Sequence, residues 1–227
     1  MGIADLDEQA LELLRSVDSA TLANAIERLE LRDRTSGYIG GKARCFFPEL
    51  GVVTGRALTV KMTSVPGRPG GREGFWELWE RLEGLAGPSM LVVQDVSGQA
   101  DRVAYCGEIM ATMGQRLGAV AMVTDGGVRD LDEVRALGFQ YFAPFPVVSH
   151  GNFEIASVGE PVTVFGETVA TGDVLHGDAN GVVVVPDCDA GALEAAIEAI
   201  RSSERGLLEL IRSDEFTVAR ARAHAGY

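Results

Sequence analysis

The sequence predicts a single α/β domain with helical segments at both ends, spanning residues 1–227. Buried apolar runs alternate with amphipathic runs in the middle of the chain, as strands and helices do in α/β proteins. Both ends carry amphipathic or Ala-, Glu- and Leu-rich stretches that favour helices. Because 46% of the 227 residues are hydrophobic, the chain can form one sizeable core.

Two short amphipathic helices are expected before residue 30. Asp5 or Asp7 can cap the first helix, and Asp18 or Ser19 can cap or restart the second. Apolar residues recur at helical spacing behind each of these caps. The domain therefore begins with a pair of helices.

A strand, a loop and an aromatic helix are expected next. Residues 51–62 are β-branched and alternate in polarity, which is typical of a strand. Two prolines and three glycines in residues 64–72 cannot continue it, so a flexible loop is expected. The stretch EGFWELWERLEGL then predicts a helix with one apolar stripe. We interpret Trp76 and Trp79 as packing residues of the core or of a subunit interface, rather than as a platform for a ligand.

The middle of the chain predicts a βαβα arrangement. SMLVVQDV and AVAMVTD are apolar runs of strand length, which indicates two buried strands. Residues 107–117 between them have helical character, and DLDEVRALG predicts a second helix that ends at Gly138. Such units place helices on the face of a parallel sheet.

Short strands and then helices are expected in the last third. Gly and Asp residues punctuate β-rich runs, with hairpin-like turns near Gly166-Glu167 and Gly172-Asp173. From Asp189 onward the composition favours one or two helices.

Composition excludes several classes of partner. The net charge is −13 and no block of Lys or Arg forms a basic stripe, so nucleic acid is not an expected partner. The apolar runs are too short to cross a bilayer and the N-terminus lacks the basic start of a signal peptide, so we expect a cytoplasmic protein without a membrane partner. Three widely separated cysteines indicate reduced thiols rather than disulfides or a zinc site.

The candidate site lies in GEIMATMGQRLGAVAMVTDGGVRD, residues 107–130. A helix from Glu108 would be roughly 15 Å long, and a strand over residues 119–124 would run back about 20 Å beside it. Since the two lengths nearly cancel, Arg129 and Asp130 should return to the start of the helix. We therefore expect Glu108, Arg129 and Asp130 to share one cleft at the carboxyl end of a buried strand.

Backbone and cation chemistry in this cleft suit an anionic oxo acid. The unpaired N–H groups of Ile109 and Met110, in the first helical turn, suit a carboxylate or enolate oxygen. Gly107 permits close approach of the backbone. Arg129 can donate two parallel hydrogen bonds to a carboxylate or keto acid.

Carboxylates are the candidate metal ligands. With no His or Cys cluster nearby, Asp130 and Glu108 supply the hard oxygen ligands that favour Mg²⁺ or Mn²⁺ with several waters retained. A structural interpretation stays open, in which Asp130 caps a helix that has Asp132 and Glu133 in its first turn. In that case Arg129 is a surface partner for these acids.

The stretch GEIMAT…GAVAMVTDGGVRDLDEVRALGF resembles the RraA-like family. This family includes the class II 4-hydroxy-4-methyl-2-oxoglutarate/4-carboxy-4-hydroxy-2-oxoadipate aldolases, whose hallmark is an acid, twenty intervening positions and then Arg-Asp. Here residues 109–128 separate Glu108 from Arg129-Asp130. The similarity extends to SATLANAIERL and to GEPVTVFGETVATGDVLHGDANGVVVVP, and so covers most of the chain.

The resemblance implies an α/β/β/α sandwich assembled as a homotrimer or homohexamer, with active sites between subunits. It implies a metal-dependent pyruvate aldolase or oxaloacetate decarboxylase, acting on a small anionic 2-oxo acid. Asp130 would bind Mg²⁺ or Mn²⁺ together with waters, and Glu108 would act on the ion through water. Arg129 would contact the pyruvyl part of the substrate, while the amides of Ile109 and Met110 would hold its carboxylate.

Two departures from the aldolase pattern leave the substrate open. The chain has Glu108 where the aldolases usually have Asp, and SVPGRPGGREGFW replaces a shorter loop of the PGDN type. Within this loop we interpret Arg68 and Arg72 as solvated charges, the alternative being closure over a second substrate carboxylate.

The sequence leaves the general base open. His150 is a candidate if its loop approaches the cleft, the alternative being a hydrogen-bonded turn residue, and a metal-activated water could serve instead. His176 is expected to support a hairpin with Asp178. Covalent catalysis by Cys106 is not expected, since no paired His is evident and a carboxylate adjoins it.

A non-catalytic function also stays open. RraA-like proteins include regulators that bind and inhibit an RNA-processing endoribonuclease without a metal site. For such a protein-binding role, the exposed acidic surface would matter more than Glu108, Arg129 and Asp130. A phosphohistidine-type carrier ranks last, because no His has a persuasive phosphoacceptor context.

Overall fold

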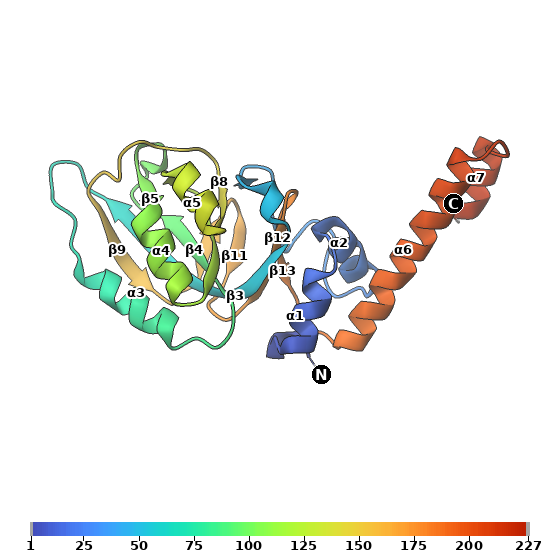
Figure 1. Ribbon diagram of the computed structural model, residues 1–227, viewed down its shortest axis with the longest axis horizontal. Coiled ribbons are helices and arrows are strands. Elements are labelled where there is room, and N and C mark those ends of the chain that lie inside the picture. Colours follow the sequence, from blue (N-terminus) through green and yellow to red (C-terminus); the bar gives the residue numbers. More distant parts are fainter. Residues whose placement is uncertain (1, 226–227) are drawn as a thin grey trace.

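The computed structural model describes residues 2–225, with strands and helices alternating in the middle and helices at both ends (Figure 1). The α-helices of these residues are α1 (Glu8–Arg15), α2 (Ser19–Arg28), α3 (Glu73–Glu83), α4 (Glu108–Arg116), α5 (Leu131–Leu137), α6 (Ala190–Arg212) and α7 (Val218–Ala225). The strands are β1 (Tyr38–Ile39), β2 (Arg44–Cys45), β3 (Val53–Ser64), β4 (Ser89–Asp95), β5 (Ala104–Cys106), β6 (Ala119–Thr124), β7 (Gly127–Val128), β8 (Gln140–Ala143), β9 (Phe153–Val158), β10 (Val162–Val164), β11 (Glu167–Val169), β12 (Val174–Asp178) and β13 (Gly181–Val185).

The main sheet has the strand order β1-β13-β12-β3-β4-β6-β8-β2, and β9 also pairs with β3. β3, β4, β6 and β8 are parallel, whereas the flanking pairs are antiparallel. The parallel centre follows from the expected βαβα order, because a crossover helix returns the chain to the same edge.

The parallel strands are buried on both faces, because successive side chains point to opposite sides. On β4, Leu91 and Val93 pack in the core under α3, α4 and α5, whereas Met90 and Val92 pack in a second core. That second core also contains apolar residues of β10, β11, β12 and β13. The layers are therefore helix, sheet, sheet and helix, and the α/β/β/α prediction is confirmed.

α1, α2 and the first part of α6 form the outer layer beyond β12 and β13, whereas the rest of α6 and α7 extend away from the body (Figure 1). α1, α2 and α6 each begin at an aspartate whose side chain accepts a backbone N–H of the first turn: Asp7 from Ala10, Asp18 from Thr21 and Asp189 from Ala192, each at 2.9 Å. The predicted helical ends are confirmed. No helix in residues 2–225 has the length and apolarity that a bilayer span requires.

Two local features differ from the sequence-based prediction. The turn at Gly172-Asp173 does not form a hairpin, because it joins β11 to β12 and these strands pair with different partners; β12 instead forms its hairpin with β13. A small parallel sheet of β5 and β7 was also not predicted. Both of its strands are too short, at three and two residues, to give a periodic signal.

Candidate functional site

The β5–β7 sheet positions the two loops of the candidate site. Cys106 pairs with Val128, and the N–H of Arg129 donates to the carbonyl of Cys106 at 2.9 Å. The chain leaves β5 directly into α4 and leaves β7 directly into α5. Glu108 and Asp130 are therefore neighbours, as the cancelling lengths predict, but a separate small sheet rather than the main sheet holds them.

The carboxylate of Asp130 faces the start of α4. Its Oδ2 accepts the backbone N–H of Glu108 at 2.9 Å and lies 3.5 Å from Nε of Arg129. Asp130 occupies the N-cap position of α5 but its side chain makes no cap hydrogen bond there, and its backbone is left-handed at φ 57° and ψ 48°. The helix-cap interpretation of Asp130 is therefore wrong.

The first-turn acids of α5 are also not partners of Arg129. Asp132 instead pairs with Arg135 at 3.2 Å, and Arg135 pairs in turn with Glu49 at 2.9 Å. Arg129 has its ion pair with Asp130, and about a third of each of these side chains is exposed. The site pair thus stays open to a ligand.

Gly107 is required by space rather than by backbone angle. Its φ is −141°, which any residue adopts. A Cβ there would lie inside van der Waals contact with Oδ2 of Asp130, and 2.9 Å from Nε of Arg129. Only glycine lets the two loops approach this closely.

The first turn of α4 presents backbone donors. The N–H of Glu108 is used by Asp130, and the first intrahelical bond runs from Ala111 to Gly107 at 3.0 Å. Ile109 and Met110 lie between them, in the part of a helix whose N–H groups have no intrahelical acceptor. Both line the adjacent pocket, and Ile109 is 81% exposed. These amides can serve an anionic oxygen, as the sequence predicts.

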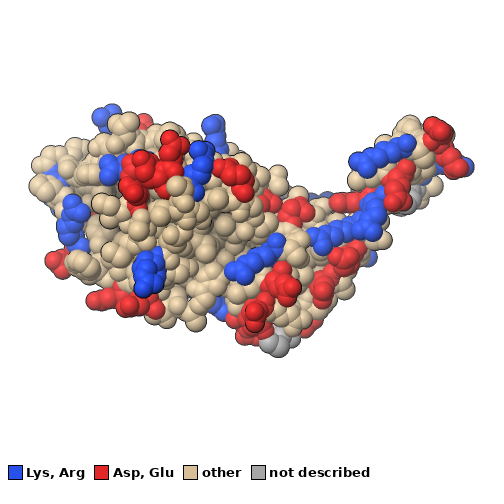
Figure 2. Space-filling model, viewed as in Figure 1, with Lys and Arg blue, Asp and Glu red and all other residues tan. Residues whose placement is uncertain are grey.

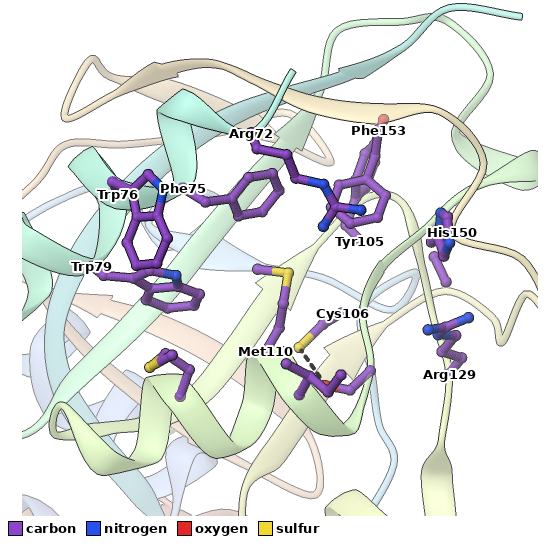
Figure 3. Close-up of a pocket in the computed structure, with 14 residues that line it drawn as sticks. Arg72, Phe75, Trp76, Trp79, Tyr105, Cys106, Met110, Arg129, His150 and Phe153 are labelled. Carbon is purple, nitrogen blue, oxygen red and sulfur yellow. Dashed lines mark hydrogen bonds between the residues drawn. The ribbon is translucent and has the colours of Figure 1, made fainter. Parts of the chain in front are cut away.

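A pocket of about 360 Å³ opens beside this helix start (Figure 3). Its lining residues are Arg72, Phe75, Trp76, Trp79, Ala104, Tyr105, Cys106, Gly107, Ile109, Met110, Met113, Arg129, His150 and Phe153. Arg129 and Gly107 thus face the pocket, whereas Glu108 and Asp130 are not part of its wall. The carboxylate of Glu108 is exposed, and it is the backbone of Glu108 that contacts Asp130.

Three pocket residues bear on interpretations made from the sequence. Trp76 is 62% exposed and Trp79 is half-buried against the core, and both lie on the pocket wall. Core packing is thus confirmed in part for Trp79, and packing of Trp76 at a subunit interface stays a prediction. Arg72 lines the pocket, whereas Arg68 pairs with Glu154. Arg72 is exposed as well as on the pocket wall, so both interpretations of this residue stay open. The helical pattern of residues 73–83 predicts a helix but does not predict that its aromatic side chains lie opposite α4.

His150 approaches the pocket through its loop. Its Nδ1 lies 2.7 Å from the carbonyl of Gly151, and its ring contacts Phe153 edge-on at 5.3 Å between centroids. If Nδ1 carries the proton and donates to that carbonyl, Nε2 is left as the basic nitrogen. His176, in contrast, is buried with Nε2 2.9 Å from the carbonyl of Val17.

Cys106 does not provide a nucleophile. Its side chain is buried, and burial raises the pKa of the thiol to about 12. The thiol therefore stays protonated near neutral pH, as expected from the sequence.

A divalent ion with a large share of water ligands fits this donor set. Residues 2–225 contain no cluster of three or more His, Cys, Asp or Glu that could form a closed metal cage. Asp130 has a second oxygen, Oδ1, without a hydrogen bond from the described residues, and one carboxylate with waters and substrate is a common arrangement for Mg²⁺. The donors suit Mg²⁺ or Mn²⁺ and do not suit a zinc site.

The layered fold and the two loops joined across β5 and β7 define an α/β sandwich protein with an arginine-lined pocket at a helix N-terminus. The family model of RraA-like proteins, described as Aldolase/RraA, matches residues 19–184. This protein belongs to the RraA-like family.

Relatives in this family carry provisional aldolase names. A protein of Halalkalibacterium halodurans, provisionally named a 4-hydroxy-4-methyl-2-oxoglutarate aldolase, is 31% identical over 102 residues, which are 44% of this chain and 48% of that protein. A protein of Pseudomonas syringae pv. tomato with the same provisional name is 35% identical over 112 residues, 47% of this chain and 65% of that protein. The chain thus spans about half to two thirds of the length of these relatives.

Solved structures share the whole fold. An uncharacterised protein from Pseudomonas syringae pv. tomato superposes with a TM-score of 0.73 at 25% identity, over 96% of this chain and 93% of that one. Streptomyces coelicolor RraAS2, described as an unusual member of the RNase ES inhibitor RraA family, gives 0.66 at 23% identity, over 91% and 98%.

Proposed function

We propose that this protein is a lyase that cleaves a C–C bond next to a 2-oxo acid and releases pyruvate through its enolate. Aldol cleavage of a 4-hydroxy-2-oxo acid and decarboxylation of oxaloacetate both fit this description. The family assignment and the provisional aldolase names of relatives support the class of reaction. The proposal depends most on one observation, the placement of Arg129 beside the open first turn of α4.

The pyruvyl group would be held by cation and amide donors. Arg129 can donate to the carboxylate or keto oxygen, and the N–H groups of Ile109 and Met110 can donate to the oxygens that gain charge as the bond breaks. These donors are already oriented, because the Asp130 contact holds the loop of Arg129 against the helix start. Preorganised donors of this kind need not reorganise during the reaction.

Asp130, with Glu108 acting through a water, would hold Mg²⁺ or Mn²⁺ at this position. The ion, when bound, would supply Lewis-acid stabilisation of the enolate oxygen. Glu108 is the first residue of α4 and is exposed, so its carboxylate is accessible to water.

His150 is the proposed general base for aldol cleavage. It lies on the pocket wall with Arg129, and its Nε2 can accept the proton of a distal hydroxyl group. Decarboxylation needs no such base, because the bond breaks with loss of CO₂. Aldol cleavage should therefore depend on His150, whereas decarboxylation should not.

The proposal is tested by following pyruvate release from oxaloacetate and from 4-hydroxy-4-methyl-2-oxoglutarate, with Mg²⁺ or with EDTA. We expect turnover that requires the metal and that Arg129→Ala and Asp130→Ala each abolish without loss of folding. Arg116→Ala, on the exposed last turn of α4, is the matched control. Equal turnover in EDTA would refute the metal requirement, and full activity of both site variants would place the site elsewhere.

We further propose a homotrimer or homohexamer, as the resemblance implies. Light scattering should then give a mass of three or six times 24.1 kDa. A species of 24.1 kDa at working concentration would contradict an active site shared between subunits.

The alternative is a non-catalytic regulator that binds an RNA-processing enzyme. The described neighbour RraAS2 belongs to an inhibitor family, and the net charge of −13 would suit a basic partner. On the face shown in Figure 2, however, acidic side chains lie among Lys and Arg rather than in one patch. If inhibition of an endoribonuclease occurs and is equal for the native protein and Arg129→Ala, the regulator role is supported.

A further inference from the structure

The pocket beside α4 has two ends of different chemistry (Figure 3). Phe75, Trp76 and Trp79 of α3 face Met110 and Met113 of α4 across one end. Arg72, Arg129 and His150 lie toward the other end. The pocket thus offers an apolar wall and, across from it, side chains that can carry positive charge.

No Asp or Glu lines this pocket. The carboxylate of Asp130 lies outside the pocket wall and is paired with Nε of Arg129 at 3.5 Å, so a ligand carboxylate at this end would meet the guanidinium rather than an unpaired acid. A second carboxylate at the aromatic end would lie against the apolar side chains of Trp76, Trp79 and Met113, which offer it no opposite charge. The wall at this end therefore favours an apolar group over a carboxylate.

The aromatic end is also incompletely covered by the chain itself. Trp76 is 62% exposed and Met113 is 38% exposed, so each has apolar surface that a bound group could remove from water. Trp79 and Phe75 are partly buried and pack against the core, which fixes this side of the pocket. A flat or bulky apolar group suits this surface, because aromatic side chains form stacked or edge-to-face contacts with other rings.

We propose that the substrate is a 4-hydroxy-2-oxo acid with an aromatic or bulky apolar group on C4, bound with that group against Trp76, Trp79 and Met113. This inference rests on the proposed lyase function and adds the class of substrate. The 1-carboxylate and 2-oxo group lie at Arg129 and the α4 amides. This orientation satisfies both ends of the pocket at once.

The reaction balances without a further reagent. His150 takes the proton of the C4 hydroxyl, the C3–C4 bond breaks, and its electron pair passes to C3 of the pyruvyl enolate. The C4 fragment leaves as an aromatic or apolar aldehyde or ketone. Return of a proton to C3 then gives pyruvate.

The two tryptophans provide a direct readout of binding. They are the only two in the sequence, and both line this pocket. Tryptophan emission, excited at the red edge of indole absorption, therefore reports on this site. The probes are 3-phenylpropanoate, propanoate and glutarate, which do not absorb there and which differ only in the distal group.

We expect 3-phenylpropanoate to change the emission and to bind about tenfold or more tightly than propanoate, because a phenyl ring is taken from water. Glutarate should bind no more tightly than propanoate. Met113→Glu, which places a carboxylate on the apolar wall, should remove the preference for the phenyl ring. Thr112→Glu is the matched control, since Thr112 is exposed on the same helix and does not line the pocket.

Three outcomes would overturn the inference. The first is glutarate binding as tightly as 3-phenylpropanoate, and the second is equal affinity for the phenyl ring in Met113→Glu and Thr112→Glu. The third is a blue-shifted tryptophan emission that no acid changes, with a mass above 24.1 kDa, because another copy of the chain would then fill the aromatic end.

Binding and turnover separate this inference from the proposed function. A preference for the phenyl ring without pyruvate release from any 4-hydroxy-2-oxo acid would leave the pocket assignment standing and refute the lyase. Pyruvate release from dicarboxylic substrates without a preference for the phenyl ring would support the lyase and refute the pocket assignment.

Discussion

The carboxylate of Asp130 accepts the backbone N–H of Glu108, 22 positions earlier in the chain, at 2.9 Å. This single bond joins the loop that carries Arg129 to the first turn of α4. Asp130 holds a left-handed backbone conformation to make it, and does not cap its own helix. Such conformations cost energy in non-glycine residues and concentrate at functional sites.

Asp130→Asn separates the charge of this residue from its hydrogen bond. The amide oxygen of Asn can still accept from Glu108, and Asn tolerates left-handed backbone. We expect a free energy of unfolding within about 0.5 kcal/mol of the native value, and pyruvate release reduced by about 100-fold or more. Urea denaturation and steady-state kinetics measure the two quantities. Activity near the native level would show that the carboxylate charge is dispensable.

Gly107→Ala tests the close packing of the two loops. The added Cβ would press on Asp130 and on Nε of Arg129, and overpacking of this kind costs about 1–3 kcal/mol. We expect lower stability together with loss of turnover. Gly41→Ala is the control, since a Cβ at Gly41 meets nothing within 4 Å. If Gly107→Ala were as stable and as active as Gly41→Ala, the close contact of Gly107 with Asp130 and Arg129 would be refuted.

Arg129→Lys keeps the positive charge and removes the planar pair of donors. If Arg129 binds the pyruvyl group with two parallel bonds, kcat/KM should fall by about 10- to 100-fold. Arg116→Lys, at the exposed end of α4, should leave kcat/KM unchanged. A fully active Arg129→Lys enzyme would mean that charge alone is sufficient.

His150→Asn distinguishes the two reactions of the proposed lyase. Without the basic nitrogen, aldol cleavage should slow by about 100-fold, because general bases contribute on that scale. Oxaloacetate decarboxylation should stay within about twofold of the native rate. Parallel losses in both reactions would instead assign His150 a role in binding or folding.

Asp125→Asn should stabilise the protein in a pH-dependent manner. Burial raises the pKa of Asp125 to about 6, although the N–H of Asp95 donates to it at 2.6 Å. In the unfolded chain the pKa of this carboxyl is near 3.9, so the partly buried carboxylate destabilises the fold above pH 6, and this penalty disappears as the pH falls from about 6 toward 4. The gain from Asn should thus be largest at pH 8 and small at pH 4.5. Urea denaturation at both values measures it, and a gain that is independent of pH would argue against the raised pKa.

The elements of the fold were predictable because their signals are local. Asp7, Asp18 and Asp189 are side-chain caps, and the apolar runs of β4 and β6 exceed what an exposed strand tolerates. The sheet order was not predictable from such signals, since pairing depends on contacts between distant segments. The turn at Gly172 shows this, because Gly and Asp occur both in hairpin turns and in turns that lead to a strand of another sheet, as the connection from β11 to β12 does.

The candidate site was predictable in part. The expected lengths of α4 and β6 were enough to predict that Glu108 and Asp130 lie close together, although the strand order of the sheet was unknown. The positions of Arg72 and Trp76 were not accessible, because they depend on how α3 lies against α4. The cap interpretation of Asp130 failed for a similar reason, since the left-handed backbone that turns its side chain away from α5 leaves no sequence signature in an Asp residue.

Helix α6 also determines where the protein can be attached to a surface. Its 23 residues correspond to roughly 35 Å, and its buried side chains all lie in the first eight positions. The remainder carries α7 to the end of the molecule opposite α3 (Figure 1). An anchor on a biosensor chip attached through α7 would therefore leave the tryptophan-lined mouth facing the flowing solution.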